Sequence, residues 1–301
     1  MKTLVTGGAG FIGSQIVDIL LKNHDVVILD NLSSGRYINE KAKLIKADIR
    51  DDLDKIFAEE KPEIVIHTAA QVQLRESLKD PINDAQHNIL GTINVLEACR
   101  KNNVKKIIYT ATGGARYGQP EKLPVKESDP IAPTSPYGIS KHTAEHYVWL
   151  YDELYGLNSI TFCFGNVYGP RDTPESGRVI PSFITRILAG KQPEVYGDGN
   201  QTRDFLYVKD LAEFIANSIN KSPKHKLFNL ANGEQVSVNQ IISILSKISG
   251  SNIKPVHTKA IKGEVRDILL DTTLAIEELG WNPRCSIEQG LKDTYEWFKN
   301  E

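Results

Sequence analysis

A tyrosine and a lysine stand one helical turn apart in residues 135–141, SPYGISK. In a helix, Tyr137 and Lys141 would lie on the same face. A phenol with its ordinary pKa of about 10 is a poor base at neutral pH, but a neighbouring ammonium group stabilises the phenolate and lowers that pKa. The pair therefore predicts a tyrosinate that abstracts a proton with help from a lysine. A surface tyrosine and lysine at helical spacing would look the same, so the prediction depends on what the chain places beside them.

Three glycines near the N-terminus supply a site for a cofactor. Gly7, Gly10 and Gly13 follow an apolar run at residues 2–6 and overlap a helical pattern that begins at Phe11. In a strand–turn–helix unit, one glycine permits the tight turn, one lets a phosphate approach the main chain, and one lets the helix pack close to the strand. The N–H groups at the start of the helix then bind a pyrophosphate. The spacing predicts a dinucleotide-binding loop.

A carboxylate at Asp30 narrows the choice of dinucleotide. Residues 25–30 read as a second strand that ends in this acid, about 20 residues after the glycines, where dinucleotide-binding folds place the acid that holds the adenosine ribose. Asp30 would accept hydrogen bonds from the ribose hydroxyls and repel a 2′-phosphate. NAD is therefore favoured over NADP.

The elements that must position these groups alternate between strand and helix up to about residue 165. Further strands are predicted at residues 43–47, 64–67, 104–110 and 159–164, with helices at 52–60, 81–102 and 135–155. This alternation predicts an α/β fold, a Rossmann-like doubly wound parallel sheet covered by helices on both faces. The strands are mostly continuous apolar runs, as expected of a sheet buried on both sides.

The pattern changes after Pro170. Residues 171–178 and 190–203 form polar loops rich in Gly, Pro and Asp, and shorter elements follow at 208–220, 238–248 and 274–279. We expect residues 1–170 to form the NAD-binding domain with the Tyr/Lys pair. Residues 171–301 would form a smaller C-terminal α/β substrate-binding lobe, with some segments returning to the first domain. A cleft between the two would hold the ligand.

Composition excludes several other classes of protein. The formal net charge of −2 gives no reason to expect nucleic acid or a membrane as partner, and no apolar run is long enough to span a bilayer. The chain starts directly in a strand, so we expect no signal peptide. Cys99, Cys163 and Cys285 are odd in number and lack metal-ligand spacing, so no disulfide framework or metal site is predicted and a cytoplasmic location is expected. His67 is interpreted as a packed or cofactor-adjacent histidine.

Several motifs together resemble the extended short-chain dehydrogenase/reductase family, in its nucleotide-sugar epimerase branch. The resemblance covers nearly the whole chain and is carried by residues 6–13, 30–36, 47–51, 67–71, 88–94, 117–118, 137–141, 165–171, 197–205 and 263–266. It implies NAD as cofactor, a nucleotide sugar as substrate and a homodimer formed through the helices at 81–102 and 135–155.

The resemblance also implies a role for individual residues. Tyr137 would be the base, Lys141 would bind the nicotinamide ribose, and Thr112 would hold the substrate 4-oxygen. The implied cofactor-binding residues are Gly7, Gly10, Phe11, Ile12, Gly13, Asp30, Asn31, Ser33, Ser34, Gly35, Asp48, Ile49, Ala69, Ala70, Gln71, Asn88, Tyr137, Lys141 and Phe164. The implied substrate-binding residues are Thr112, Tyr137, Asn166, Val179, Tyr196, Arg203 and Arg266. Val179 and Tyr196 could equally be packing residues.

The chain departs from the family pattern at three places. Gly113 stands where relatives carry the Ser or Thr that bonds the 4-oxygen, which is why Thr112 is assigned that role. Cys163 replaces a usual arginine. A common phosphate-binding arginine falls at Ile261, so Arg266, or alternatively Lys262, would supply that charge.

The activity implied is inversion at C4 of a UDP-hexose by transient oxidation with bound NAD, which interconverts UDP-glucose and UDP-galactose. UDP-N-acetylglucosamine and UDP-glucuronate are alternative substrates. A nucleotide-sugar dehydratase or decarboxylase is a weaker alternative, because Gly113-Gly114 stands where dehydratases of the family carry an acidic pair. A non-catalytic NAD-binding protein is another, and such proteins typically lose the Tyr/Lys pair that this chain keeps.

Overall fold

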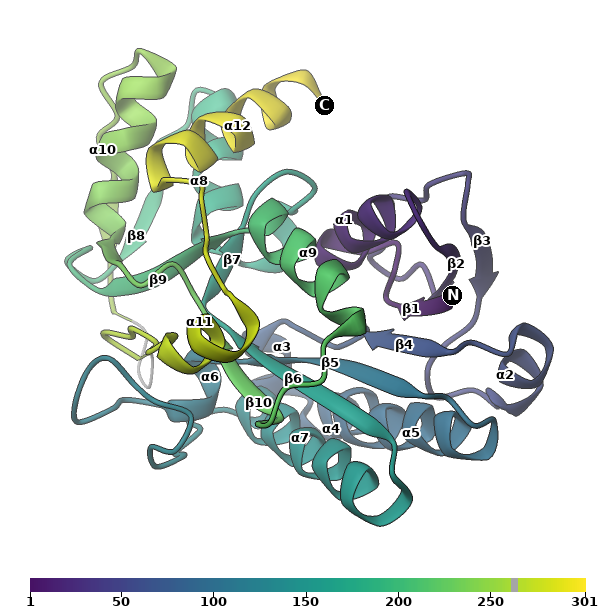
Figure 1. Ribbon diagram of the computed structural model, residues 1–301. Coiled ribbons are helices and arrows are strands. Elements are labelled where there is room, and N and C mark those ends of the chain that lie inside the picture. The colour runs from purple at the N-terminus through teal and green to yellow at the C-terminus, as the bar shows by residue number, and fades with distance from the viewer. Residues whose placement is uncertain (261–264) are drawn as a thin grey trace.

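A seven-stranded parallel sheet forms the centre of the computed structural model, which describes residues 1–260 and 265–301 (Figure 1). Its strand order is β10-β6-β5-β4-β1-β2-β3, the order of a doubly wound dinucleotide-binding sheet with one strand added. The predicted fold class is confirmed. The strands are β1 (Lys2–Thr6), β2 (Asp25–Asp30), β3 (Lys43–Lys46), β4 (Ile64–His67), β5 (Lys106–Thr112), β6 (Asn158–Phe164) and β10 (Leu227–Leu230).

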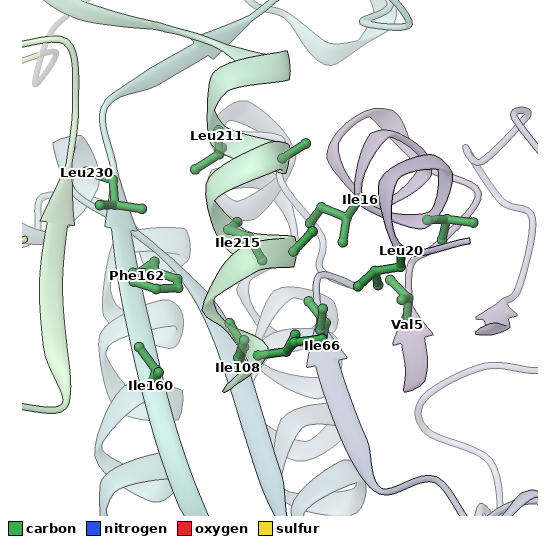
Figure 2. Packing of buried hydrophobic residues seen from close by; sticks show 14 of the residues in the cluster. Val5, Ile16, Leu20, Ile66, Ile108, Ile160, Phe162, Leu211, Ile215 and Leu230 are labelled. Atoms are coloured by element: carbon green, nitrogen blue, oxygen red, sulfur yellow. The ribbon is translucent and has the colours of Figure 1, made fainter. Parts of the chain in front are cut away.

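One face of this sheet is covered by α1 (Phe11–Leu20) and α9 (Val208–Asn217), which pack against each other. Figure 2 shows Ile16 and Leu20 of α1 lying beside Ile215 of α9, above the strand residues Ile66 and Ile108. All five side chains are almost completely buried. Burial of each side chain contributes about 1.5–3 kcal/mol. Helix α9, although it follows residue 200, is therefore held firmly against α1 and the seven-stranded sheet.

The opposite face is covered by α2 (Asp54–Glu60), α5 (Gly91–Lys101) and α7 (Pro136–Tyr155). Helix α7 begins after Ser135, whose hydroxyl accepts a hydrogen bond from the Gly138 N–H, and Pro136 occupies the first helical position, where its missing N–H costs nothing. The helix therefore starts where the sequence predicts it, and this fixes the place of Tyr137 in its first turn.

The remaining elements, apart from α11, build a second apolar cluster beside the sheet (Figure 1). A three-stranded sheet has the order β11-β9-β7, and β8 pairs with β12. The helices around them are α8, α10 and α12. The bounds are β7 (Asn166–Tyr168), α8 (Val179–Leu188), β8 (Glu194–Tyr196), β9 (Thr202–Tyr207), β11 (Gln235–Ser237), α10 (Val238–Ser249), β12 (Val256–Thr258), α11 (Thr273–Leu279) and α12 (Ile287–Asn300).

Two segments after residue 170, besides α9, return to the first sheet. Strand β10 pairs with β6 in parallel along its whole length, and α11 packs against β10. A division of the chain into domains at residue 170 stays a prediction. None of the helices in residues 1–260 and 265–301 is long and apolar enough to cross a membrane.

Four details differ from the sequence prediction. The helix predicted at 81–102 is α4 (Pro81–Ala85), a π-helical turn (Gln86–Leu90) and α5, and single π turns of this kind are frequent at functional sites. The strand predicted at 104–110 is shifted to 106–112, because β5 pairs with β6 as far as Thr112. Helix α2 begins at Asp54 rather than residue 52, since the Asp52 carboxylate accepts a hydrogen bond from the Asp54 N–H. The prediction also lacks α3 (Leu74–Lys79), α6 (Gly114–Tyr117), α8, α12 and the short strands outside the seven-stranded sheet.

Candidate active site

The glycine loop lies between β1 and α1 at the carboxyl edge of the sheet. Gly7 has a φ of +68°, and a Cβ there would lie 2.7 Å from the Ala69 nitrogen. A Cβ on Gly13 would lie 2.2 Å from the Gly7 oxygen, whereas one on Gly10 would meet only that oxygen, at 3.2 Å. Gly7 and Gly13 are thus required by the protein's own packing, while the side of Gly10 is open. A pyrophosphate fits this cradle, with the N–H groups of Phe11 and Ile12 at the start of α1.

Asp30 holds the glycine loop against the end of β2. Its carboxylate accepts hydrogen bonds from the Ala9 N–H at 3.0 Å and the Leu32 N–H at 2.8 Å. A Cβ on Gly35 would lie 2.9 Å from the Ala9 Cβ, so the segment containing Ser33, Ser34 and Gly35 packs directly on the loop. Each carboxylate oxygen has a second lone pair for a ribose hydroxyl. Asp30 therefore fits an adenosine ribose while it also braces the loop.

The predicted adenine end is a small polar network. The Asn31 side chain donates to Asp48 at 2.8 Å, and Arg50 binds the same carboxylate through Nε and Nη2 at 2.8 and 2.9 Å. These partners, Arg50 above all, hold the pKa of Asp48 well below its usual range. Ile49 is buried beside it. The network fixes residues 48–49 in place, and Arg50 is a member that the sequence prediction did not include.

Tyr137 and Thr112 meet at the carboxyl edge of the sheet. Thr112 ends β5, and its side chain is near enough to Tyr137 to lower the pKa of the phenol. Burial raises the pKa of Tyr137, and the Arg178 charge and the Thr112 hydrogen bond oppose that rise. A Cβ on Gly113 would lie 2.4 Å from Leu270 Cδ1 and 2.8 Å from the Phe164 oxygen. The chain thus has no room for a side chain at Gly113, and the neighbouring hydroxyl at Thr112 reaches the tyrosine instead.

Lys141 lies one turn further along α7 and is almost fully buried. Its Nζ lies 4.3 Å from the centre of the Tyr109 ring, and burial lowers its pKa to about 7. His67 is 1% exposed. Burial, and then the Lys141 charge, lower its pKa to about 3. His67 is neutral and bonded at both nitrogens, to Thr6 at 2.6 Å and Thr92 at 3.0 Å, which confirms its interpretation as a packed histidine.

Asn88 lies on the π-helical turn and binds the segment that follows β4. Its Oδ1 accepts from the Gln71 N–H at 3.0 Å, and its Nδ2 donates to the Gln71 oxygen at 2.9 Å. These two bonds fix the loop of Ala69, Ala70 and Gln71 against the π-helical turn. Phe164, at the end of β6, is buried and accepts the Gly113 N–H through its carbonyl at 2.7 Å. The predicted cofactor residues therefore converge from the ends of five strands.

The predicted substrate residues on the second sheet also come together. The Arg203 guanidinium donates to the main-chain oxygens of Thr202 and Arg266, both at 2.9 Å, so Arg203 and Arg266 are neighbours. Asn166 begins β7, and its Oδ1 lies 3.7 Å from where a Cβ on Gly114 would be, beside the Thr112 segment. Lys262, the alternative to Arg266, lies outside the described residues.

Tyr196 contacts the cofactor half through Arg75, a residue that the sequence prediction missed. Arg75 lies in α3 (Leu74–Lys79), with its guanidinium carbon 4.8 Å from the centre of the Tyr196 ring. Val179 is the first residue of α8 and is half-buried against the second apolar cluster. No sequence pattern indicates the Arg75 contact, because the two residues are 121 positions apart.

Two further charged residues near Tyr137 were not predicted. Arg178 donates to the buried Asp172 at 2.6 Å, lies 5.3 Å from the centre of the Phe11 ring, and lowers the pKa of Tyr137. Asp84 is fully buried in α4. Both occur in segments that read as an ordinary loop and an ordinary helix. Within residues 1–260 and 265–301, no group of three or more His, Cys, Asp or Glu side chains could hold a metal ion.

Known proteins resemble this chain over its full length. A model of the NAD dependent epimerase/dehydratase family matches residues 3–231. A putative UDP-glucose 4-epimerase of Methanocaldococcus jannaschii is 46% identical over 303 residues, covering 99% of this chain and 98% of that protein. The crystal structure of a UDP-glucose 4-epimerase from Thermotoga maritima, solved with UDP-glucose, has a TM-score of 0.97 at 40% identity and covers 100% of this chain and 99% of that one. A UDP-N-acetylglucosamine 4-epimerase from Methanobrevibacter ruminantium, in complex with UDP-N-acetylmuramic acid, has a TM-score of 0.93 at 35% identity and covers 99% of this chain and 98% of that one.

Proposed function

Since this chain belongs to the NAD dependent epimerase/dehydratase family, we propose that it is an isomerase that interconverts UDP-glucose and UDP-galactose, with NAD as its cofactor. The observation that carries the proposal is the placement of Tyr137 and Lys141 one turn apart at the start of α7, with Thr112 at the end of β5 near Tyr137. The full-length similarity to UDP-glucose 4-epimerases supports the choice of substrate.

Tyr137 acts as the base in this proposal. Its phenolate accepts the proton of the C4 hydroxyl, while the Thr112 hydroxyl holds the C4 oxygen through a hydrogen bond. Bound NAD supplies a group that accepts a hydride from C4 and returns it. Lys141 provides the positive charge that stabilises the phenolate and donates to the nicotinamide ribose. When the hydride returns to the opposite face of the 4-keto sugar, Tyr137 gives back the proton and C4 is inverted.

The second sheet retains the nucleotide while the sugar turns. Asn166 and Arg203 bind the diphosphate, and the planar guanidinium suits two phosphate oxygens at once. Arg266, the neighbour of Arg203, adds a second positive charge. Because these contacts lie on β7, β9 and the segment beside them, the diphosphate can stay fixed while the sugar rotates about its bond to phosphate.

A substrate panel tests the proposal. Purified protein is incubated separately with UDP-glucose, UDP-N-acetylglucosamine and UDP-glucuronate, and the products are identified by chromatography and NMR. We expect UDP-galactose from UDP-glucose. Conversion of only one of the other two sugars would reassign the substrate, and a 4-keto-6-deoxy or decarboxylated product would reassign the reaction.

Substitution of the base tests the mechanism. Tyr137→Phe should lower kcat by about 10²- to 10⁴-fold, the usual contribution of a general base. Tyr155→Phe, at the exposed end of the same helix, is the matched control and should leave kcat unchanged. Full activity of Tyr137→Phe would rule out this tyrosine as the base.

We also propose that the protein forms a homodimer through α4, α5 and α7, which lie on one side of the molecule (Figure 1). Large apolar side chains are exposed on these helices and on the π-helical turn between α4 and α5, including Ile82 at 71%, Leu90 at 58% and Leu154 at 62%. A patch of this kind is typical of an interface. Light scattering should report twice the mass of 33.5 kDa, and Leu154→Glu should shift the protein toward the monomer.

A further inference from the structure

Asp84 is a completely buried carboxylate beside the catalytic helix. Its Oδ1 accepts hydrogen bonds from the side chains of Gln71 and Asn88, both at 3.0 Å. Its Oδ2 has no hydrogen-bond partner among the described residues. Burying a carboxylate oxygen without a partner destabilises the folded state. A positive charge nearby would offset that loss of stability.

A buried cation, Lys141, lies on the helix that packs against α4. Helix α4 and the π-helical turn both pack against α7, which carries Tyr137 and Lys141 (Figure 1). Burial lowers the pKa of Lys141, and Cys163, Asp84 and Glu145 oppose that effect. Asp84 also raises the pKa of Tyr137, after burial as the main cause. Asp84 therefore acts on both members of the Tyr/Lys pair.

The other groups that face Lys141 do not supply a free negative charge. From β4 comes the neutral His67, and from β5 the ring of Tyr109. From β6 comes Cys163, whose thiol pKa is raised by burial, so it stays protonated. On α7 itself, Glu145 is already bound by the buried Arg116. Of these groups, Asp84 is the one carboxylate that no arginine or lysine side chain in the described residues binds directly.

We propose that Asp84 is a positioning residue that holds Gln71 and Asn88 in place and supplies the negative charge that keeps Lys141 protonated. The inference rests on the proposed function, because a protonated Lys141 matters only if Tyr137 works as a base. The carboxylate is buried in α4, which packs against the helix that carries the Tyr137/Lys141 pair. Its two hydrogen bonds also join the π-helical turn to the loop after β4. One side chain therefore both positions the loop of Ala69, Ala70 and Gln71 and contributes charge near Tyr137 and Lys141.

The pH dependence of kcat/KM tests the charge. Asp84→Asn keeps the shape and removes the charge, so both ionisations of the Tyr137/Lys141 pair should move to lower pH. We expect the acidic and alkaline limbs of the profile to shift together by about one pH unit. Asp84→Glu, which keeps the charge, should lower kcat without shifting either limb. Asp80→Asn, at the exposed start of the same helix, is the control and should change neither. Unshifted limbs in Asp84→Asn would overturn the proposal, since a purely structural role lowers activity at every pH alike.

A measurement without turnover separates this inference from the proposed function. The side-chain carbon resonance of Lys141 is followed by NMR as a function of pH, and Lys141→Met identifies the signal. Its midpoint should fall in Asp84→Asn even if no sugar in the panel is a substrate. If Asp84→Asn does not fold, adding Lys141→Met should restore folding, because the uncompensated buried ammonium is then removed. A double variant that also fails to fold would contradict the charge pairing.

Discussion

A methyl group on Gly13 would lie 2.2 Å from the carbonyl oxygen of Gly7. The first turn of α1 therefore packs directly on the residue that follows β1, with no space for a side chain between them. Because the atom that a methyl group would meet is in the main chain, no side chain could move to relieve the clash. The glycine loop is therefore shaped by contacts within the protein as well as by the ligand it would hold.

This geometry predicts different outcomes for two similar substitutions. Gly13→Ala should displace the loop, destabilise the protein by about 3 kcal/mol as overpacking does, and lose NAD. Gly10→Ala meets only the Gly7 oxygen at 3.2 Å, so it should keep most of the stability and still lose NAD, because its methyl group points into the cradle. Urea unfolding and the NAD released on denaturation measure the two effects. Equal stability of the two variants would contradict the assignment of Gly13 to internal packing and of Gly10 to the NAD-binding side of the loop.

His67 should make the protein sensitive to acid. Its pKa in the folded state is about 3 and about 6.5 when unfolded. Between these values the unfolded chain binds a proton that the folded protein does not, so stability falls as pH falls from 6.5 toward 3, by at most about 1.4 kcal/mol per pH unit. His67→Gln should flatten this dependence in urea titrations between pH 7 and 4, whereas the exposed His257→Gln should not. A parallel dependence for wild type and His67→Gln would contradict the prediction.

Arg203 should contribute to nucleotide binding in the NAD-loaded protein. Charge-assisted hydrogen bonds contribute about 1.5–3 kcal/mol, so Arg203→Ala should weaken UDP binding by about 10- to 100-fold in calorimetric titration. Arg186→Ala, which removes an arginine of α8 that is paired with Glu194 of β8, is the matched control and should bind UDP as the wild type does. Equal affinities in the two variants would exclude Arg203 from the diphosphate site.

The Arg75–Tyr196 contact should couple the two sides of the site. Cation–π contacts at exposed positions contribute about 0.5–1 kcal/mol, so Arg75→Ala and Tyr196→Ala should each raise KM by roughly two- to five-fold. The double variant should show little more than either alone, because both remove the same contact. Tyr196→Phe keeps the ring, so its KM should stay near the wild-type value. Fully additive effects would show that the contact does not act as a unit.

Much of the cofactor half could be predicted because its signals are local. The glycines, the apolar strand at residues 2–6 and the acid at Asp30 are joined within a single strand–turn–helix–strand unit, and the structure places them as expected. Gly113 could be seen as a departure from the family pattern. Its cause could not, because it depends on Leu270 and Phe164, and a collision between distant parts of the chain has no periodic signature.

The residues that were missed share a physical reason. Asp84, Arg75 and Arg178 lie in segments whose hydrophobic pattern is satisfied without them, and each acts through a partner far away in sequence. The pattern of residues 81–102 reads as one helix, since a π-helical turn shifts the register by a single residue and leaves the apolar spacing almost unchanged. A charge buried between α4 and the helix of Tyr137 and Lys141 can be found only once the helices are packed.

Strand β10 has a consequence for how the protein is made. It pairs along the outer edge of β6, yet it is synthesised roughly 60 residues later, which at 5–20 residues per second is about 3 to 12 seconds of translation. During that interval β6 presents an open row of main-chain donors and acceptors to anything nearby. The last strand of the seven-stranded sheet to leave the ribosome thus closes its edge. A chain that stopped before residue 227 would leave β6 as an unpaired edge strand, open to pairing with another chain.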